Sequence, residues 1–502
     1  MKPETIKKLE ELKNCLKEIH YLEHASAILS LDRSVSMPKN GSKDRGEVLG
    51  CLSNIVYNII TSDRFKNLIY SFQEEDLDFI SQRGIKKLKK YFEDMNKVPE
   101  DRQQQWIITT SEAQSKWEEA KIKDDYSIFK PSLEEIINMT REFLEYYGYE
   151  ENPYDALLDK YQSGLTVKKL DKVFYDLKEG LVDILNKLKE SNVIIKEDFL
   201  KKKTCKTQQK ELCMYVLNKI GFDFNSGAVA ESEHPFTTNT SNKDIRLTVK
   251  YVENNFTKAI FSSIHEGGHG IYEQNIPESL SDIGLNGAAS MSLHESQSRF
   301  YENIIGRSYE FWKGIYPKAQ EIVNHLKDVS LDDFYKAINK VEPSLVRIKS
   351  DEVTYNLHII IRYELEKMIV NGEVNLNDLP ELWNKKYNEY LGMNAENYED
   401  GILQDMHWGA GMFGYFPSYA LGNIYSAQFL NAMFKDMPNM YEEIGKGDLS
   451  HVNKWLRENI HCHGEIYDTD ELLKKVTGEE LNCKYFLDYL RNKYSKIYNV
   501  SL

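Results

Sequence analysis

The sequence predicts a mainly α-helical protein with one short β-strand region. Apolar residues recur with helical spacing through most of the 502 residues. Only Asp244 to Tyr251 alternates apolar and polar residues and is rich in β-branched types, which is typical of a strand. The chain shows no internal repeat, low-complexity linker or abrupt change in composition. We therefore expect one helical body rather than several independent units.

In the N-terminal half, turn residues mark the ends of the expected helices. The first helix covers residues 3 to 30 and is broken by the turn residues Met37 to Gly41. Later helices are expected at 44–62 and roughly 75–95, 100–122, 131–147 and 167–191, with Asn152-Pro153-Tyr154 and Ser163-Gly164 separating the last two. After Asn254-Asn255, which turns the chain into a helix at 261–274, helices are expected at roughly 288–306, 318–328, 331–340, 350–371, 379–390, 418–435, 450–461 and 483–497.

The composition excludes several classes of function. The hydrophobic fraction of 41% and the charged fraction of 28% are those of a soluble globular protein. A formal net charge of −15 argues against general nucleic-acid binding, which needs a clustered basic surface. No apolar run approaches the roughly 20 residues that span a bilayer, and the N-terminus has no signal-peptide core, so we expect a cytoplasmic protein. The six scattered cysteines are expected to be reduced thiols.

The stretch FSSIHEGGHGIYEQ, residues 261 to 274, carries the most specific chemical signal. His265, Glu266 and His269 form an H-E-x-x-H pattern. On a helix the two imidazoles lie on one face, one turn apart, and can reach the same metal ion. Glu266 projects beside that ion and can act as general base for its bound water. The alternative is two surface histidines on an ordinary helix. The strand at 244–251, just before this helix, is expected to hold an extended substrate by main-chain hydrogen bonds.

A catalytic zinc ion normally has three protein ligands, so a third residue is needed. The best candidate is Glu295, which lies 26 residues after His269 (295 − 269) on a separate predicted helix. Glu302 and Glu273 are weaker candidates, and Glu273 fits better as a hydrogen-bond partner of a ligand. The neighbouring His294 is expected to pack or to make such a hydrogen bond rather than to bind the metal.

Two further features near these residues need an interpretation. Gly267 and Gly268 each cost about 1 kcal/mol inside a helix relative to alanine. Their presence suggests that a neighbouring helix approaches the backbone closely, and a tolerated kink is the alternative. His461-Cys462-His463 resembles a metal site, but consecutive residues diverge on a helix and no partner cluster lies nearby in the sequence.

Six segments of the chain form an ordered series of motifs: His234-Pro235-Phe236, Asp244 to Thr248, His265 to His269, His294 to Gln297, Val346 to Asp351 and Gly401 to Trp408. This series resembles the carboxypeptidase Taq family of metallocarboxypeptidases, also called thermostable carboxypeptidase 1. The resemblance covers almost the whole chain, and Ser350 and the Ser30-Leu31-Asp32 segment are its visible departures.

The resemblance implies a single peptidase domain over residues 1–502. Its fold is expected to be a two-lobed helical zincin of the neurolysin and angiotensin-converting-enzyme type, with a small β-sheet beside the active site. A deep central groove is expected from about residues 234–420. The resemblance also implies a homodimer, dependence on zinc or cobalt, and removal of C-terminal residues from peptides with broad specificity. The implied partners are peptides with a free C-terminus, and neither nucleic acid nor membrane.

The remaining candidate residues divide between stabilising the transition state and binding the substrate. His407 and Tyr415 are candidates for donors to the carbonyl oxygen, because related helical zinc peptidases use a His and a Tyr from a similar segment. A guanidinium can bind the substrate carboxylate through two hydrogen bonds, and Arg347 is the better candidate than Arg246, which has a structural alternative. Four further residues are assigned roles: Gln404 as a hydrogen-bond partner of the substrate backbone, His234 as a residue lining the groove or a structural histidine, and Asp351 with Asp405 as residues that orient their neighbours.

Two other functions remain open at this point. An oligopeptidase that cuts internal bonds would not require an arginine for the terminal carboxylate. A catalytically silent peptide-binding or scaffold protein has no chemical need for the complete set of His265, Glu266, His269 and Glu295.

Overall fold

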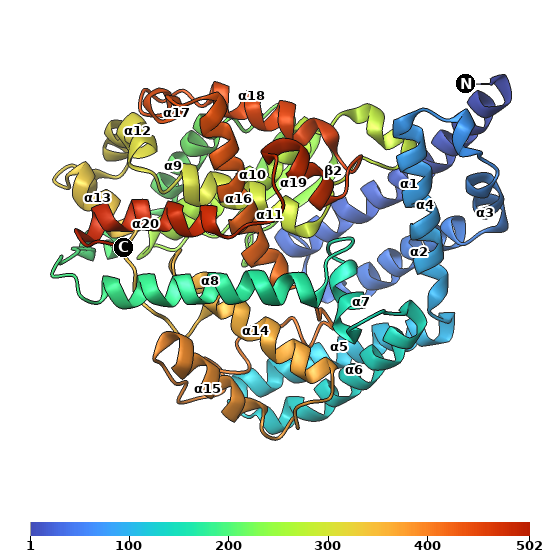
Figure 1. Ribbon diagram of the computed structural model, residues 1–502, viewed down its shortest axis with the longest axis horizontal. Helices are drawn as coiled ribbons and strands as arrows, with labels where there is room; N and C mark the ends of the chain where they lie inside the picture. The colour runs from blue at the N-terminus through green and yellow to red at the C-terminus, as the bar shows by residue number, and fades with distance from the viewer. Residues whose placement is uncertain (1) are drawn as a thin grey trace.

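Twenty α-helices and a three-stranded sheet make up the computed structural model, which describes residues 2–502 (Figure 1). The helices of the first part are α1 (Pro3–Val35), α2 (Ser42–Ile60), α3 (Asp63–Tyr70), α4 (Phe79–Lys97), α5 (Glu100–Lys123), α6 (Tyr126–Tyr147), α7 (Pro153–Asp159), α8 (Val167–Leu188) and α9 (Lys206–Ile220). The prediction of a mainly helical protein with a small sheet is confirmed. None of the helices in the described chain is both long and apolar enough to cross a membrane.

The second part carries the sheet and the remaining helices. The strands are β1 (Gly227–Glu231), β2 (Thr237–Ser241) and β3 (Asp244–Val249). The helices are α10 (Phe256–Asn275), α11 (Met291–Arg299), α12 (Tyr309–Ile322), α13 (Leu331–Ile338), α14 (Tyr355–Val370), α15 (Leu379–Leu391), α16 (Pro417–Asp436), α17 (Met440–Ile444), α18 (Ser450–Asn459), α19 (Thr469–Thr477) and α20 (Lys484–Tyr498).

Capping residues explain where the predicted boundaries were right and where they were wrong. Asn255 caps α10, because its side chain accepts a hydrogen bond from the Lys258 backbone (3.3 Å). The segment at 152–154, expected to be a turn, is instead the capped start of α7. The helix expected at 318–328 is wrong, because α12 begins after the cap Ser308 and contains Pro317 in its interior. The start of α12 is therefore marked by the hydroxyl of Ser308 and not by Pro317.

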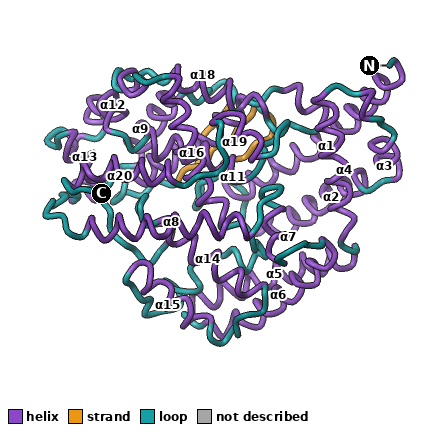
Figure 2. The backbone as a smooth tube through the Cα atoms, viewed as in Figure 1, coloured by secondary structure: helices purple, strands orange, loops and turns teal. Residues whose placement is uncertain are grey.

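The sheet differs from expectation in one functionally important way. Its strand order is β1-β3-β2, with β1 parallel and β2 antiparallel to β3, so the predicted strand β3 is central. The main-chain groups of β3 bond to both neighbours, and β3 therefore cannot bind a substrate as an added strand. That prediction is wrong. The edge strand β2, rich in Thr, Asn and Ser and only half-buried, was not predicted. Figure 2 shows the three strands grouped together within the helices.

One large hydrophobic core runs through the molecule, from Leu12 in α1 to Tyr498 in α20. The long helix α8 crosses the middle of the view in Figure 1 and contacts both α14 below it and α20 above it. Helices α10 and α11 lie above α8 in this view, and α5, α6, α14 and α15 lie below it. The two-lobed arrangement with a deep groove, and the neurolysin-type assignment, stay predictions.

Candidate metal centre and catalytic site

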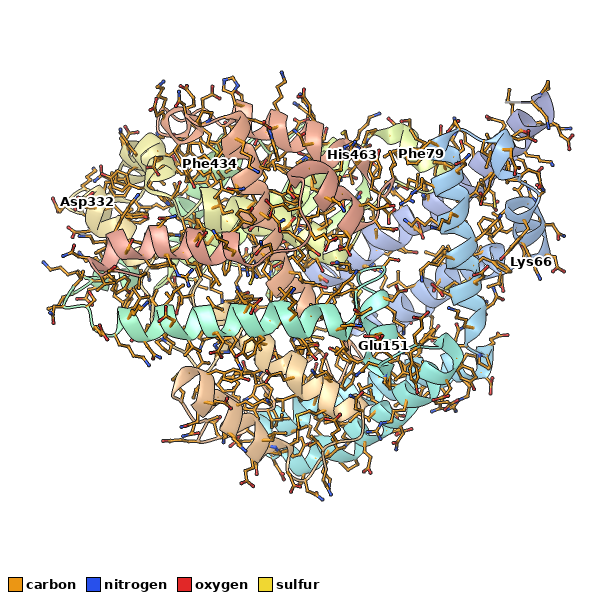
Figure 3. The ribbon with its side chains drawn as sticks, viewed as in Figure 1. Lys66, Phe79, Glu151, Asp332, Phe434 and His463 are labelled. Carbon is orange, nitrogen blue, oxygen red and sulfur yellow. The ribbon has the colours of Figure 1, made fainter. Side chains whose placement is uncertain are left out.

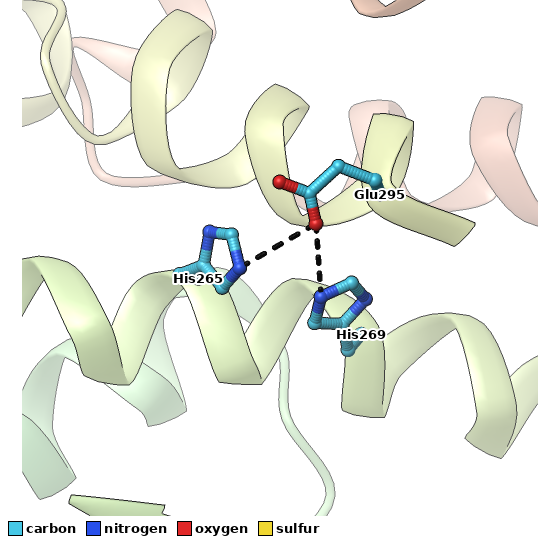
Figure 4. Close-up of side chains that lie close together, drawn as sticks. All are labelled: His265, His269 and Glu295. Carbon is cyan, nitrogen blue, oxygen red and sulfur yellow. Dashed lines mark ion pairs between the residues drawn. The ribbon is translucent and has the colours of Figure 1, made fainter. Parts of the chain in front are cut away.

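Two neighbouring helices bring the three predicted ligands together. His265 and His269 lie one turn apart on α10, and Glu295 faces them from α11 (Figure 4). Glu295 Oε2 lies 3.6 Å from His265 Nε2 and 3.4 Å from His269 Nε2. Two ligands bound tetrahedrally at the distances usual for zinc would be separated by about 3.3 Å. The three side chains therefore fit a small divalent cation without rearrangement.

Glycines allow the close approach of these helices. A Cβ atom on Gly268 would lie 2.7 Å from the Gln297 carbonyl oxygen and 2.8 Å from Ser298 Cα, both in the α11 backbone. On the other side of α11, a Cβ atom on Gly422 of α16 would lie 2.6 Å from Glu295 Cγ. The close contact predicted for the glycine pair is thus confirmed at Gly268, where the neighbour is the helix that carries Glu295.

Hydrogen-bond partners orient two of the three ligands, His265 and Glu295. His265 Nδ1–H donates to Glu302 Oε2 (2.9 Å), which directs the Nε2 lone pair toward the site. Arg299 Nε donates to Glu295 Oε1 (2.6 Å), so Oε2 is the oxygen presented to the histidines. Burial raises the pKa of Glu302, but the bond from His265 and the charge of Arg299 outweigh it and bring the pKa to about 2.

His269 has the protonation state that a ligand needs. Burial lowers its pKa to about 3, so the imidazole is neutral at pH 7. Its ring stacks on His294, with centroids 4.4 Å apart, and His294 Nε2–H donates to Glu273 Oε1 (2.7 Å). The predicted packing and hydrogen-bonding role of His294 is what the structure shows. Glu273 bonds to His294, and Glu302 bonds to the outer nitrogen of His265.

Glu266 is held at the edge of the sheet. It is buried on α10, and Thr237 of β2 donates its hydroxyl proton to Glu266 Oε2 (2.6 Å). Burial raises the pKa of Glu266, which makes the carboxylate a better proton acceptor than an exposed one. Thr237 was not identified from the sequence, because β2 itself was not predicted.

A second cluster of charges surrounds Asp405. Its Oδ1 accepts hydrogen bonds from Arg347 Nε (3.0 Å) and Nη2 (2.8 Å), and its Oδ2 accepts from Arg362 Nε (2.6 Å). Arg347 Nη1 donates to the Tyr355 hydroxyl (3.1 Å). A guanidinium has five N–H groups, so three are used within the protein and two remain. The predicted anchor Arg347 is therefore buried and already paired.

Side chains on one face of α14 bond to the loop that carries Arg347 and to the loop that carries Asp405. Tyr355, His358, Arg362 and Glu366 recur at helical spacing on this helix. Glu366, fully buried, accepts hydrogen bonds from the Trp408 indole (2.8 Å), the Gly414 backbone (2.9 Å) and a tyrosine hydroxyl. These bonds lower the pKa of Glu366, but the effect of burial is larger and raises the pKa to about 7.

The predicted donors His407 and Tyr415 lie in the loop that Glu366 holds. Their ring centroids are 5.8 Å apart, and Tyr419, one helical turn after Tyr415, lies beside both. The Tyr419 hydroxyl is 3.3 Å from His407 Nε2. Burial lowers the pKa of His407 to about 4, and burial raises the pKa of Tyr415 to about 12, so both groups are neutral at pH 7. Tyr419 was missed although it lies in the same segment.

The two charged clusters are linked through a tyrosine. The Arg299 guanidinium, which bonds to Glu295, lies 4.5 Å from the centre of the Tyr355 ring. The hydroxyl of the same Tyr355 accepts from Arg347. Arg347 is therefore separated from the predicted metal ligand Glu295 by only two side chains. Arg299 and Tyr355 were not assigned roles from the sequence.

Three other predicted residues, Gln404, Arg246 and Asp351, bond to groups within the protein. Gln404 accepts from the Arg347 backbone (2.9 Å) and donates to the Leu345 carbonyl (3.1 Å), so it fastens the loop of Arg347. Arg246 pairs with Asp244 on its own strand. Asp351 fastens the turn that precedes α14 by accepting from the Thr354 backbone (2.9 Å).

The two remaining histidines differ in burial. His234 is exposed, and its backbone oxygen accepts a hydrogen bond from Ser232. His461, set aside as a metal ligand, is fully buried and donates through Nε2 to the Gln297 side chain (2.8 Å) behind α11.

Comparison with known proteins agrees with this geometry. Residues 11–494 match the family described as carboxypeptidase Taq (M32) metallopeptidase. Carboxypeptidase 1 of Bacillus subtilis is 46% identical over 492 residues, which cover 97% of this chain and 98% of that protein. Thermostable carboxypeptidase 1 of Pyrococcus furiosus is 38% identical over 481 residues, 95% of this chain and 96% of that protein.

The fold is also similar to solved structures. The crystal structure of the M32 carboxypeptidase from Deinococcus radiodurans has a TM-score of 0.96 at 30% identity, and the alignment covers 98% of this chain and all of that one. The structure of the Pyrococcus furiosus carboxypeptidase has a TM-score of 0.94 at 36% identity, covering 97% of this chain and 99% of that one.

Proposed function

The chain belongs to the carboxypeptidase Taq (M32) family and is a metallocarboxypeptidase, and from that premise we propose that it removes C-terminal residues from short peptides with broad specificity. The family resemblance inferred from the sequence is confirmed. The proposal is supported by one observation above all. His265 Nε2, His269 Nε2 and Glu295 Oε2 converge within 4.8 Å of one another. Glu266 follows His265 directly in the sequence and is held by Thr237.

We propose that His265, His269 and Glu295 hold a divalent cation, zinc or cobalt. Two imidazoles and one carboxylate are a ligand set that suits zinc and leaves a position open. When bound, such an ion polarises the scissile carbonyl and makes the attacking water more acidic. The partners of the ligands, Glu302 and Arg299, fix the orientation of His265 and Glu295 before the ion arrives.

Glu266 is the proposed general base. Its carboxylate takes a proton from the water as the water oxygen bonds to the scissile carbonyl carbon. The carbon–nitrogen bond then breaks, and the same proton passes from Glu266 to the leaving amine. His407 and Tyr415, joined by Tyr419, are the proposed neutral donors to the carbonyl oxygen as it gains negative charge.

Arg347 is the proposed anchor of the substrate carboxylate. Asp405 and Tyr355 fix the plane of its guanidinium, and the two remaining N–H groups are available for a second anion. Arg246 is assigned a structural role, because Asp244 already pairs with it. Gln404 acts on the substrate only by holding the loop of Arg347, since its side chain is fully engaged within the protein.

We further propose that the chain forms one catalytic unit over its whole length, a homodimer that acts in the cytoplasm on peptides with a free C-terminus. The large core that extends from α1 to α20 supports the single unit. The homodimer and the cytoplasmic location follow from the resemblance and the sequence alone.

Mass spectrometry of one short peptide tests the proposal. The peptide is offered with a free or an amidated C-terminus, with zinc or cobalt, and then with a chelator. We expect stepwise loss of terminal residues from the free acid only, abolished by the chelator. Glu266→Gln should lower kcat by about 10²- to 10⁴-fold with metal content unchanged, because it removes the general base and no ligand.

The same experiment separates the competing functions. Cleavage at internal bonds of both peptides would indicate an oligopeptidase. Binding of both peptides without cleavage in either metal would indicate a scaffold protein. Glu278→Gln, which changes an exposed glutamate that pairs with Lys243, is the matched control and should leave kcat unchanged.

A further inference from the structure

A cavity of about 870 Å³ lies outside the metal centre, between α12, α13, α16 and α20. Asp332 and Phe434, both part of its wall, are labelled in Figure 3 at the end of the molecule formed by these helices. Small-molecule sites in proteins usually measure about 300–1,000 Å³. None of the residues assigned to catalysis or substrate binding lines this cavity.

Charges of both signs line the cavity. Lys484 and Asp488 pair with each other at the rim. Lys336 and Lys496 make no ion pair or side-chain hydrogen bond with any residue in 2–502. Glu310 likewise has no ion-pair partner within that part of the chain. Unpaired ammonium groups and an unpaired carboxylate therefore face the same space.

Lys493 supplies a buried ammonium group to the same wall. Its side chain is only 7% exposed, and its Nζ donates to Glu352 Oε2 (2.7 Å) and to the Tyr489 hydroxyl (3.1 Å). An ammonium group has three N–H donors, so one remains. A buried charge that is not fully hydrogen-bonded favours a ligand that completes its bonds.

Aromatic rings cover much of the remaining wall. Phe434 and Tyr441 have ring centroids 5.4 Å apart, and Tyr309 and Tyr335 pack edge to face at 5.4 Å. Glu310 lines the cavity together with Tyr335 and Tyr441, and after burial its charge raises the pKa of both tyrosines. The aliphatic residues Ile304, Leu430 and Ile497 complete the apolar surface.

We propose that this cavity binds a free amino acid with a large apolar or aromatic side chain. The α-carboxylate would bond to Lys336 and Lys493, the α-ammonium group to Glu310, and the side chain would pack on the rings of Tyr335, Phe434 and Tyr441. An anion alone would leave Glu310 unpaired, and a cation alone would leave the lysines unpaired. Free amino acids are what a carboxypeptidase releases, and the choice of ligand class rests on that activity.

The position of Lys493 connects the cavity to the catalytic loops. Its partner Glu352 follows Asp351 in the turn before α14, and Tyr494 of α20 donates to the same Glu352 oxygen (3.0 Å). Arg347 lies five residues before Glu352 in this segment. A ligand in the cavity would therefore contact the helix that fixes the loop carrying the proposed substrate anchor.

Equilibrium dialysis of L-phenylalanine against the metal-loaded enzyme tests the proposal. We expect saturable binding that weakens about tenfold or more in Lys336→Ala, because a charged hydrogen bond is lost. Asn431→Trp, which places a large ring in the cavity, should abolish it. Lys327→Ala, at an exposed lysine outside the cavity, is the control and should bind as the wild type does. Peptide hydrolysis by all three variants should stay within about twofold of wild type, since none touches the metal centre.

Ligand analogues identify the chemistry that is recognised. L-phenylalaninamide lacks the carboxylate, N-acetyl-L-phenylalanine lacks the ammonium group, and glycine lacks the side chain. Each should bind about tenfold more weakly or worse. Absence of L-phenylalanine binding overturns the proposal. Binding that persists in Asn431→Trp and disappears with a chelator also overturns it, because the ligand then sits at the metal centre. Dialysis needs no peptide cleavage, so a failure of the proposed function does not affect this result.

Discussion

The metal centre and the Asp405 cluster are both buried and charged. The metal centre presents its ligand atoms to an open point, whereas the arginine of the Asp405 cluster is already paired. At the metal centre, Glu302 and Arg299 occupy the outer atoms of His265 and Glu295, and three lone-pair atoms converge on an open point. In the Asp405 cluster, Arg347 is already paired with Asp405, which it shares with Arg362. Orienting a ligand and anchoring a substrate therefore use the same kind of ion pair. The difference is which atoms the pair leaves free.

This comparison is tested most strongly by Arg347→Lys. Lysine keeps the charge but cannot bond to Asp405 and to a substrate carboxylate in fixed planar geometry. We expect kcat/KM on peptides with a free C-terminus to fall roughly 30- to 150-fold, which corresponds to a loss of about 2–3 kcal/mol of transition-state binding. Most of this loss should appear as a higher KM. Steady-state kinetics measure this effect.

The control is Arg246→Lys, which changes an arginine paired with Asp244 on its own strand. It should leave KM within about twofold, because only a partly exposed ion pair is altered. Equal losses in the two variants would mean that Arg347 has no special role in binding the carboxylate. The Asp405 cluster would then be a structural device only.

Glu302→Gln tests the metal centre, where Glu302 is the partner of His265. The amide retains one acceptor for His265 Nδ1–H but turns an N–H group toward Arg299 or Arg307, which are donors themselves. We expect metal affinity to fall about 10- to 100-fold, as is usual when the partner of a ligating histidine is changed. Competition with a chromogenic chelator measures the affinity directly.

Glu273→Gln provides the comparison for that measurement, because Glu273 bonds to His294 and not to a predicted ligand. A loss of metal affinity at least as large in Glu273→Gln would contradict the orientation of His265 by Glu302. It would place the important hydrogen bond on the His294 side of the site instead.

The two regions also differ in how far the sequence could predict them. The H-E-x-x-H spacing predicts that His265 and His269 share a helix face, and the place of Glu295 on a separate predicted helix makes it the best third candidate, which the family motif also indicates. Sequence spacing could not show that Asp405 pairs with both Arg347 and Arg362, since these contacts join residues 58 and 43 positions apart. Because Arg347 is paired with Asp405 in the folded protein, fewer of its N–H groups can bind a substrate than its sequence motif alone implies.

The fold shows the same limit. Long amphipathic helices such as α4, α5 and α8 follow from local periodicity and were predicted to within a few residues. The short strand β2 is polar, and its pairing with β3 and its contact with Glu266 arise only from tertiary packing. Helix α14 carried a readable signal that was not used, because buried polar residues at positions 355, 358, 362 and 366 are unusual in an apolar helix.

The smallest expected effect concerns Glu366, which fastens the His407–Tyr415 loop. Its pKa of about 7 lies above the ordinary value of 4.5, so the folded state binds this proton more tightly than the unfolded state. A raised acid pKa means that stability falls as pH rises from 4.5 toward 7. Between pH 5 and pH 7 the loss attributable to this one group is about 2 kcal/mol.

Glu366→Gln removes this titration. We therefore expect the Tm of the wild type, relative to that of the variant, to fall by a few degrees between pH 5 and pH 8, because the wild type alone bears the cost of the buried charge. Thermal unfolding of both proteins across this range measures the difference. A difference in Tm that is the same at every pH would show that Glu366 is ionised throughout. The loop that carries His407 would then be held by a permanent charge, as Arg347 is held by Asp405.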